Sequence, residues 1–141
     1  MAVTQLSIFL DNTAGRLAEV ARVLGEAGIN IRGFSIADTA DYGILRLIVG
    51  DEARAAGVLR ENRFTVHEGP VILARVPDIP GGLSKALEGF AKRGLNVEYA
   101  YLAVPAAVIA FGVDEKDVEA AERILLEEGI PIVTEEELRA V

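Results

Sequence analysis

The sequence predicts an α+β protein built from two copies of one βαββαβ unit, and three observations lead to this prediction. A shift of 66 positions carries Gly28 to Ile31 onto Gly94 to Val97, so the chain is similar to itself. The shift preserves apolar alternation in the expected strands and helical spacing in the expected helices. The length of 141 residues, 51% of them hydrophobic, suits two small domains. We therefore expect one unit over residues 1–69 and a second over residues 70–141.

The first copy has the pattern of four strands and two helices. Val3 to Leu10 alternates apolar and polar residues, as a half-buried strand does. Between Gly15 and Ala27 apolar residues recur every three or four positions, which predicts an amphipathic helix ended by Gly28. The other elements of this copy are strands at 29–37, 44–49 and 64–68 and a short helix at 52–60.

The expected strand at 29–37 changes the parity of its apolar residues halfway. Ile29 and Ile31 point to one face and Phe34 and Ile36 to the other, so we expect a bulge or a strand with two apolar faces. We place Phe34 and Ile36 on the sheet face away from the helices, where they favour a homodimer.

The dipeptide Gly69-Pro70 marks the join to the second copy. Thr134 with Glu137 resembles a capping box, so a short helical turn should end the copy. Its other elements are expected at 71–76, 81–92, 95–102, 107–113, 115–127 and 130–133. The order β-α-β-β-α-β is that of the split βαβ, ferredoxin-like unit.

Each unit has about 65 residues, close to the lower limit for independent stability. We therefore expect the two units to pack side by side with a continuous antiparallel sheet, which would also cover exposed strand edges.

Composition excludes several classes of function. The formal net charge of −8 disfavours a nucleic-acid partner. The absence of Cys and the single His leave little for thiol chemistry, catalytic triads or metal sites, so we expect neither cofactor nor metal. Neither a signal peptide nor a membrane-spanning stretch is recognisable. These features predict a cytoplasmic protein with no membrane partner.

Both copies have the same kind of turn between the first strand and the first helix. The turns are Asn12-Thr13-Ala14-Gly15-Arg16-Leu17 and Asp78-Ile79-Pro80-Gly81-Gly82-Leu83, and each is followed by a Gly-apolar-Asn-apolar motif. This pattern resembles the ACT domain, a ligand-binding module attached to many enzymes of amino-acid metabolism. The resemblance covers nearly the whole chain, twice, and departs from the family at Ala14, where Pro is usual. It implies a stand-alone tandem ACT protein.

The two turns offer the chemistry that a free amino acid requires. The carboxylate of the zwitterion can accept hydrogen bonds from the free N–H groups of a helix N-terminus. Glycine at 15, 81 and 82 would let a ligand approach this backbone closely. Asn12 and Asp78 could accept hydrogen bonds from the ammonium group. The alternative, that Asn12 and Asp78 act only in capping or turn formation, stays open.

The resemblance also implies where a ligand would lie. Ligands of ACT domains commonly lie between two units, with the turn of one facing the second-strand start of the other. We therefore pair Asn12 with Asn96 and Asp78 with Asn30. The candidate ligand-binding residues are Asn12, Ala14, Gly15, Arg16, Leu17, Asn30, Asp78, Pro80, Gly81, Gly82, Leu83 and Asn96.

The sequence thus predicts a regulatory module that senses a free amino acid and is not an enzyme. The alternative is an interaction subunit with degenerate ligand sites, and a small enzyme of amino-acid metabolism is third. The expected partners are a second copy of the chain or a separate metabolic enzyme.

Two further features have open roles. Tyr99 and Tyr101 could form a pocket wall or could serve only in packing. The turn Asp38 to Gly43 could be a lid or a plain hairpin connection.

Overall fold

A computed structural model of the protein describes residues 2–38, 42–104 and 107–139. The chain divides into two compact units. The N-terminal unit contains Thr4–Gly69 and Arg139, and the C-terminal unit contains Pro70–Leu138 and residues 2–3. Each unit is a mixed α+β arrangement with antiparallel strand pairs.

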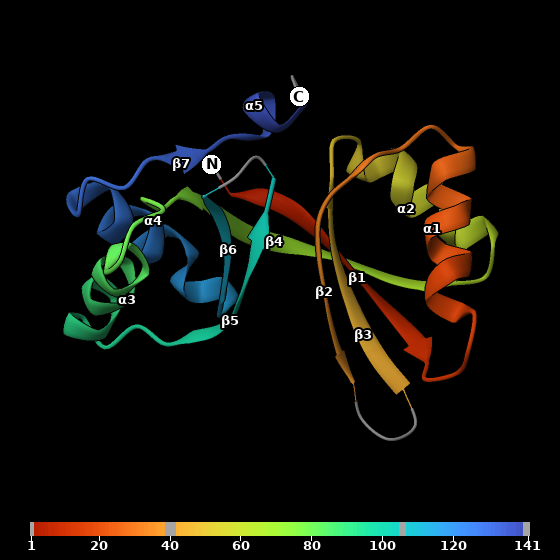
Figure 1. The fold of residues 1–141 in the computed structure, drawn as a ribbon, viewed down its shortest axis with the longest axis horizontal. Coiled ribbons are helices and arrows are strands. Elements are labelled where there is room, and N and C mark those ends of the chain that lie inside the picture. Colours follow the sequence, from red (N-terminus) through yellow and green to blue (C-terminus); the bar gives the residue numbers. More distant parts are fainter. Residues whose placement is uncertain (1, 39–41, 105–106, 140–141) are drawn as a thin grey trace. The chain divides into compact units, whose positions relative to one another are not determined.

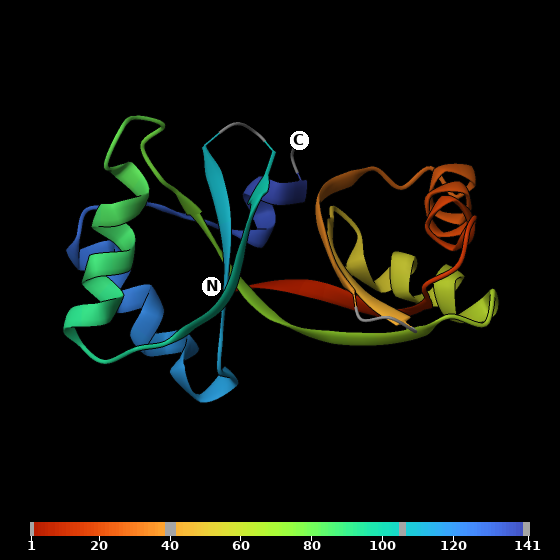
Figure 2. The same ribbon diagram turned by 60° about the horizontal axis from the view of Figure 1, so that its bottom comes forward.

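The N-terminal unit contains helices packed on one face of a sheet. Its elements are β1 (Val3–Asp11), α1 (Arg16–Glu26), β2 (Ile31–Asp38), β3 (Tyr42–Val49), α2 (Glu52–Glu61) and the first part of β4 (Thr65–Arg75). β3 pairs antiparallel with β1 and with β2. Figure 1 and Figure 2 both show α1 and α2 on the same side of these strands. The core between them includes Leu6, Ile8, Leu24, Leu45 and Leu59, all essentially inaccessible to solvent.

The C-terminal unit repeats this order of elements. It contains the second part of β4, then α3 (Gly82–Lys92), β5 (Val97–Ala103), β6 (Val108–Val113), a 3-10 turn η1 (Glu115–Asp117), α4 (Val118–Glu127), β7 (Ile132–Val133) and α5 (Glu135–Arg139). The strand order is β5-β6-β4-β7, with every neighbouring pair antiparallel. Phe90 of α3 and Phe111 of β6 pack edge to face in the core, with ring centroids 5.4 Å apart.

The strands expected at 64–68 and 71–76 form one continuous strand, β4, and Gly69-Pro70 lies inside it, where the division between the two compact units falls. One strand supplies the last strand of the N-terminal unit and the first of the C-terminal unit. Proline is compatible with extended backbone, because its fixed φ lies within the range that strands allow. The dipeptide therefore marks the point where the units meet along the chain without interrupting the strand.

The change of parity in β2 is a bulge, which was one of the two alternatives expected from the sequence. Ile31 lies opposite Val49 and Gly33 opposite Ile48, so Arg32 is the extra residue. Beyond the bulge, Phe34 lies opposite Leu47 and Ile36 opposite Leu45.

Directly opposite residues in an antiparallel pair share a face of the sheet. Leu45 and Leu47 belong to the core under the helices. The prediction that Phe34 and Ile36 lie on the face away from the helices is therefore wrong, because the extra residue returns both side chains to the helix side. They remain exposed there, at 56% and 46%.

The same irregularity recurs in β5. Val97 lies opposite Val113 and Tyr99 opposite Gly112, so the bulge has the same place in both copies. Tyr99 and Tyr101 then lie on the face away from α3 and α4, where their rings stack with centroids 6.3 Å apart. This supports packing as the role of the two tyrosines.

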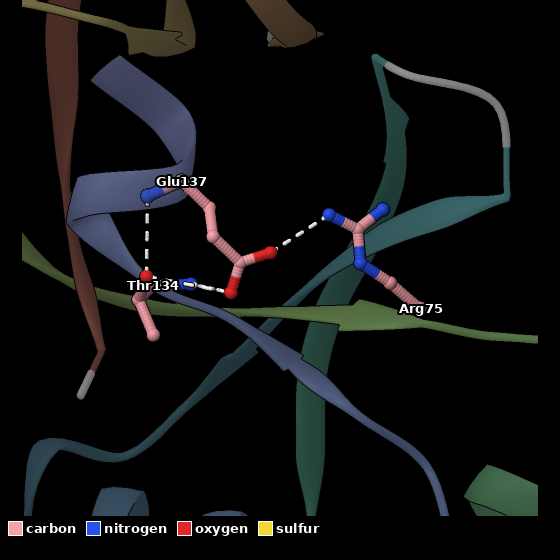
Figure 3. A network of polar contacts seen from close by, with 3 residues as sticks. All are labelled: Arg75, Thr134 and Glu137. Atoms are coloured by element: carbon pink, nitrogen blue, oxygen red, sulfur yellow. Dashed lines mark hydrogen bonds and ion pairs between the residues drawn. The ribbon is translucent and has the colours of Figure 1, made fainter. Parts of the chain in front are cut away.

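Helix α5 begins with the predicted capping box (Figure 3). The Thr134 hydroxyl accepts a hydrogen bond from the Glu137 N–H (3.2 Å), and the Glu137 carboxylate accepts one from the Thr134 N–H (3.4 Å). The Arg75 guanidinium lies 2.9 Å from the same carboxylate. The hydrogen bond from Arg75, with that from the Thr134 backbone, holds the pKa of Glu137 below its usual range.

Within 2–38, 42–104 and 107–139, no helix has the length and apolar character needed to cross a membrane.

Candidate functional site

The two strand-to-helix turns form matching corners, here called the N-terminal corner (residues 11–18) and the C-terminal corner (residues 77–84). In each, a glycine is the residue that precedes the helix, Gly15 before α1 and Gly81 before α3. Both have left-handed backbone, with φ of 90° and 87°. Other L-residues adopt this conformation only with strain, which explains why glycine occupies both positions.

Each corner presents free backbone N–H groups. The first helical hydrogen bond runs from the Glu19 N–H to the Gly15 carbonyl in α1 (2.9 Å), and from the Lys85 N–H to the Gly81 carbonyl in α3 (3.0 Å). Helix geometry therefore leaves the preceding amides, those of residues 17–18 and 83–84, without an acceptor within the helix. Their partial positive charge suits a carboxylate.

Asn12 and Asp78 do not serve as helix caps. The residues that precede α1 and α3 are glycines, and in the described chain neither helix has a side-chain N-cap hydrogen bond. Asn12, Asp78, Ala14 and Pro80 are all exposed in their turns. Simple N-capping thus does not account for the two polar residues.

Packing also requires a glycine at position 82. A β-carbon added there would lie 2.0 Å from the carbonyl oxygen of Pro77. The glycine therefore allows α3 to pack against the end of β4, as well as belonging to the corner.

The equivalent position in the N-terminal corner is Arg16, which has local partners. Its guanidinium forms an ion pair with Glu19 (2.8 Å) and lies over the ring of Phe64, 4.7 Å from the centroid. Arg16 also borders a pocket of about 490 Å³, whose other lining residues are Phe9, Leu10, Asp11, Arg63 and Thr65. This corner is thus more basic than its counterpart.

The two asparagines lie at the other end of the first helix of each unit. Asn30 and Asn96 are exposed and follow α1 and α3, respectively. Each helix has 11 residues and is therefore about 16 Å long. Within one unit, the corner and the asparagine are thus too far apart to bind the same small ligand.

Asn30 borders a pocket of about 640 Å³ in the N-terminal unit. Its other lining residues are Gly28, Ile29, Gly50, Asp51, Arg54 and Arg139. Asp51 caps α2 by accepting a hydrogen bond from the Arg54 N–H, and Arg139 pairs with Glu52 at 3.5 Å. Asp51 and Arg139, which lie beside Asn30, therefore already have local partners.

Asp78 and Leu83 border a pocket of about 310 Å³ in the C-terminal unit. The other lining residues are Val76, Pro77, Ile79, Leu102, Ala103, Ala107 and Ile109. Sequence reasoning missed the strand residues Leu102 and Ile109, because they are distant from the corner along the chain. The repeat offers one signal, since the shift of 66 carries Ile36, another exposed apolar residue, onto Leu102.

Two further predictions concern a lid and metal ligands. Residues 39–41 of the proposed lid lie outside the described residues. The described chain contains no cluster of three or more His, Cys, Asp or Glu residues suited to a metal ion.

Comparison with known proteins identifies the family. The family model of the ACT domain pair matches residues 1–141. Among solved structures, protein BT0572 from Bacteroides thetaiotaomicron is 34% identical, with a TM-score of 0.89 over 100% of this chain and 98% of that chain. No curated protein matches the sequence.

Two more distant structures share the fold. The regulatory subunit of aspartate kinase from Thermus thermophilus, in its ligand-free form, is 17% identical, with a TM-score of 0.64 over 89% of this chain and 91% of that chain. The aspartokinase alpha and beta subunits give 15% identity and a TM-score of 0.60, over 90% and 95%. The resemblance predicted from the two corner motifs is confirmed, and the chain belongs to the ACT-domain family as an ACT domain pair.

Proposed function

We propose that this ACT domain pair is a regulatory module that binds a free amino acid at its glycine corners. The observation that carries the proposal is the C-terminal corner, which combines the amides at the start of α3 with a small pocket that Asp78 and Leu83 both line. A zwitterion requires this combination of donors for its carboxylate and an acceptor for its ammonium group.

The ligand would be shared between units. We propose that the units lie side by side with a continuous antiparallel sheet, so that Asp78 acts with Asn30 and Asn12 with Asn96. The length of α1 and α3 supports this, because a corner cannot reach the asparagine of its own unit.

Regulation would follow from differential binding. An amino acid that binds one arrangement of the pair more tightly shifts the equilibrium towards that arrangement. The shared fold with a protein described as the regulatory subunit of aspartate kinase supports this role. The regulated partner would be a separate enzyme of amino-acid metabolism or a second copy of the chain, and the chain itself would not be an enzyme.

A second function has one specific observation in its favour. Phe34 and Ile36 expose apolar surface although they lie on the helix side of the sheet. Such surface suits a subunit that acts through protein–protein contact with degenerate ligand sites. Sedimentation of the chain with and without amino acids distinguishes the two functions, since the second predicts association that no amino acid changes.

A thermal-shift screen of the twenty amino acids tests the main proposal. At a concentration of 100 Kd, a ligand stabilises the native state by about 2.7 kcal/mol, which gives a measurable rise in Tm. We expect Asp78→Ala and Asn12→Ala to reduce the shift from their own corners. Glu119→Ala, which removes an exposed carboxylate of α4, is the matched control and should leave the shift unchanged. No shift with any amino acid rejects amino-acid sensing.

A further inference from the structure

Most of the side chains that line the pocket beside Asp78 are aliphatic. Among the described residues that line it, Asp78 is the one with an ionisable side chain. Ile79, Leu83 and Leu102 point apolar surface to solvent there, with exposures of 66%, 44% and 72%. Three large apolar side chains exposed around one small hollow favour an occupant that covers them.

The size of the pocket limits the occupant. Its volume of about 310 Å³ lies at the lower end of the range for ligand pockets, roughly 300–1,000 Å³. A small aliphatic group suits this space, whereas a charged side chain would lose hydration there without a partner of opposite charge other than Asp78. Asp78 disfavours acidic ligands by like-charge repulsion.

The N-terminal corner has a different chemistry, although it has the same backbone. Neutral Asn12 takes the place of Asp78. The pocket next to this corner is lined by two arginines, Arg16 and Arg63, and by Asp11, and Leu17 is not part of its lining. The two corners therefore differ in charge and in apolar surface, and only the C-terminal corner combines a carboxylate with an aliphatic pocket in the described chain.

We infer that the C-terminal corner is selective for a neutral amino acid with an aliphatic side chain. The ammonium group lies at Asp78, the carboxylate at the free amides of α3, and the side chain in the pocket against Leu83 and Leu102. This inference rests on the proposed function and adds the class of ligand to it.

Isothermal titration calorimetry of the full chain with leucine, alanine, glycine, aspartate and lysine tests the inference. Leucine should bind at least about tenfold more tightly than alanine, because an apolar pocket discriminates roughly 10- to 200-fold for each missing methylene. Aspartate and lysine should bind more weakly than leucine. Equal affinity for all five, or tighter binding of aspartate or lysine, would overturn the inference and leave amino-acid sensing intact. Binding of none of the five would overturn the inference as well, and the screen of all twenty amino acids would then decide whether the proposed function fails with it.

Single substitutions test which residues make the C-terminal corner selective for leucine. Leu83→Asn should weaken leucine binding about tenfold or more and change glycine binding little. Leu126→Asn is the matched control, since Leu126 of α4 is similarly exposed, at 51%, and is not among the residues that line the pocket, and it should leave leucine affinity unchanged. Leu17→Asn makes the equivalent change at the start of α1, in the N-terminal corner. Leu102→Asn, at an exposed strand position, gives the same test if Leu83→Asn does not fold. Loss of leucine binding in Leu17→Asn alone would place the site at the other corner.

A ligand analogue without an amino group tests the contact between Asp78 and the ammonium group. The carboxylic acid that retains the side chain of leucine and lacks the amino group should bind more weakly than leucine to the unmodified chain. Asp78→Asn should weaken the binding of leucine and should not weaken the binding of this acid, because the acid has no ammonium group and is repelled by the Asp78 carboxylate. If the acid binds the unmodified chain as tightly as leucine does, the ammonium contact to Asp78 is wrong.

Discussion

The carbonyl oxygen of Pro77 lies where a side chain at Gly82 would begin, 2.0 Å from the position of its β-carbon. Gly82 is the first residue of α3, and Pro77 follows β4 at the start of the C-terminal corner. The pair sets how closely the helix approaches the strand that precedes it, and so shapes the corner that would bind a ligand.

Gly82→Ala should destabilise the protein. The added methyl group must displace the Pro77 backbone, and overpacking of this kind typically costs about 1–3 kcal/mol. Urea unfolding followed by circular dichroism measures the loss. An unchanged free energy of unfolding would mean that the corner opens at little cost, and would weaken the view that it is preorganised.

Gly57→Ala should increase the free energy of unfolding, and it serves as the control for Gly82→Ala. Gly57 lies in the exposed interior of α2, and a β-carbon there meets no atom within 4 Å. Alanine in a helix interior is more stable than glycine by roughly 0.5–1 kcal/mol. The same urea experiment should show an increase, and a decrease would contradict the helical assignment of this segment.

Gly112 and Tyr99 should be energetically coupled. A β-carbon on Gly112 would lie 2.0 Å from the Tyr99 ring, which covers the glycine from the neighbouring strand. Gly112→Ala should therefore be destabilising, and less so when Tyr99→Ala has already removed the ring. A double-mutant cycle should give a coupling of about 0.5–3 kcal/mol. The Tyr101→Ala background is the comparison, where the cost of Gly112→Ala should persist.

Glu137 should contribute stability that depends on pH. Its pKa in the folded state is lowered, chiefly by the hydrogen bond from Arg75 (Figure 3). The contribution is therefore complete above the unfolded pKa of about 4.3 and is lost as the pH falls through the lower folded pKa. NMR titration of the Glu137 carboxyl measures this directly. In Arg75→Met the midpoint should move up, and an unmoved midpoint would show that Arg75 is not the cause.

Local patterns predicted much of the fold. Alternation in β1, helical spacing in α1 and the capping box of Thr134 with Glu137 each depend on residues close in sequence, and each was recognisable for that reason. The two corners were also predictable, because a left-handed residue before a helix requires glycine. The continuity of β4 through Gly69-Pro70 was not predictable in this way, because it depends on the strands with which β4 pairs.

Local sequence patterns could not predict the pockets. Leu83 and Leu102 line the same pocket although the rest of α3, the turn after it and most of β5 separate them along the chain. The role of Gly82 depends likewise on a carbonyl group that no sequence pattern marks.

The sequence by itself determined that this protein repeats a βαββαβ unit and has two glycine corners before its first helices, because strand alternation, helical period and left-handed turns are encoded by neighbouring residues. The tertiary structure alone decided that Phe34 and Ile36 share a face with Leu47 and Leu45, and that the Asp78 corner opens on an aliphatic pocket. Those properties depend on cross-strand register and on contacts between distant segments, which one extra residue such as Arg32 is enough to change.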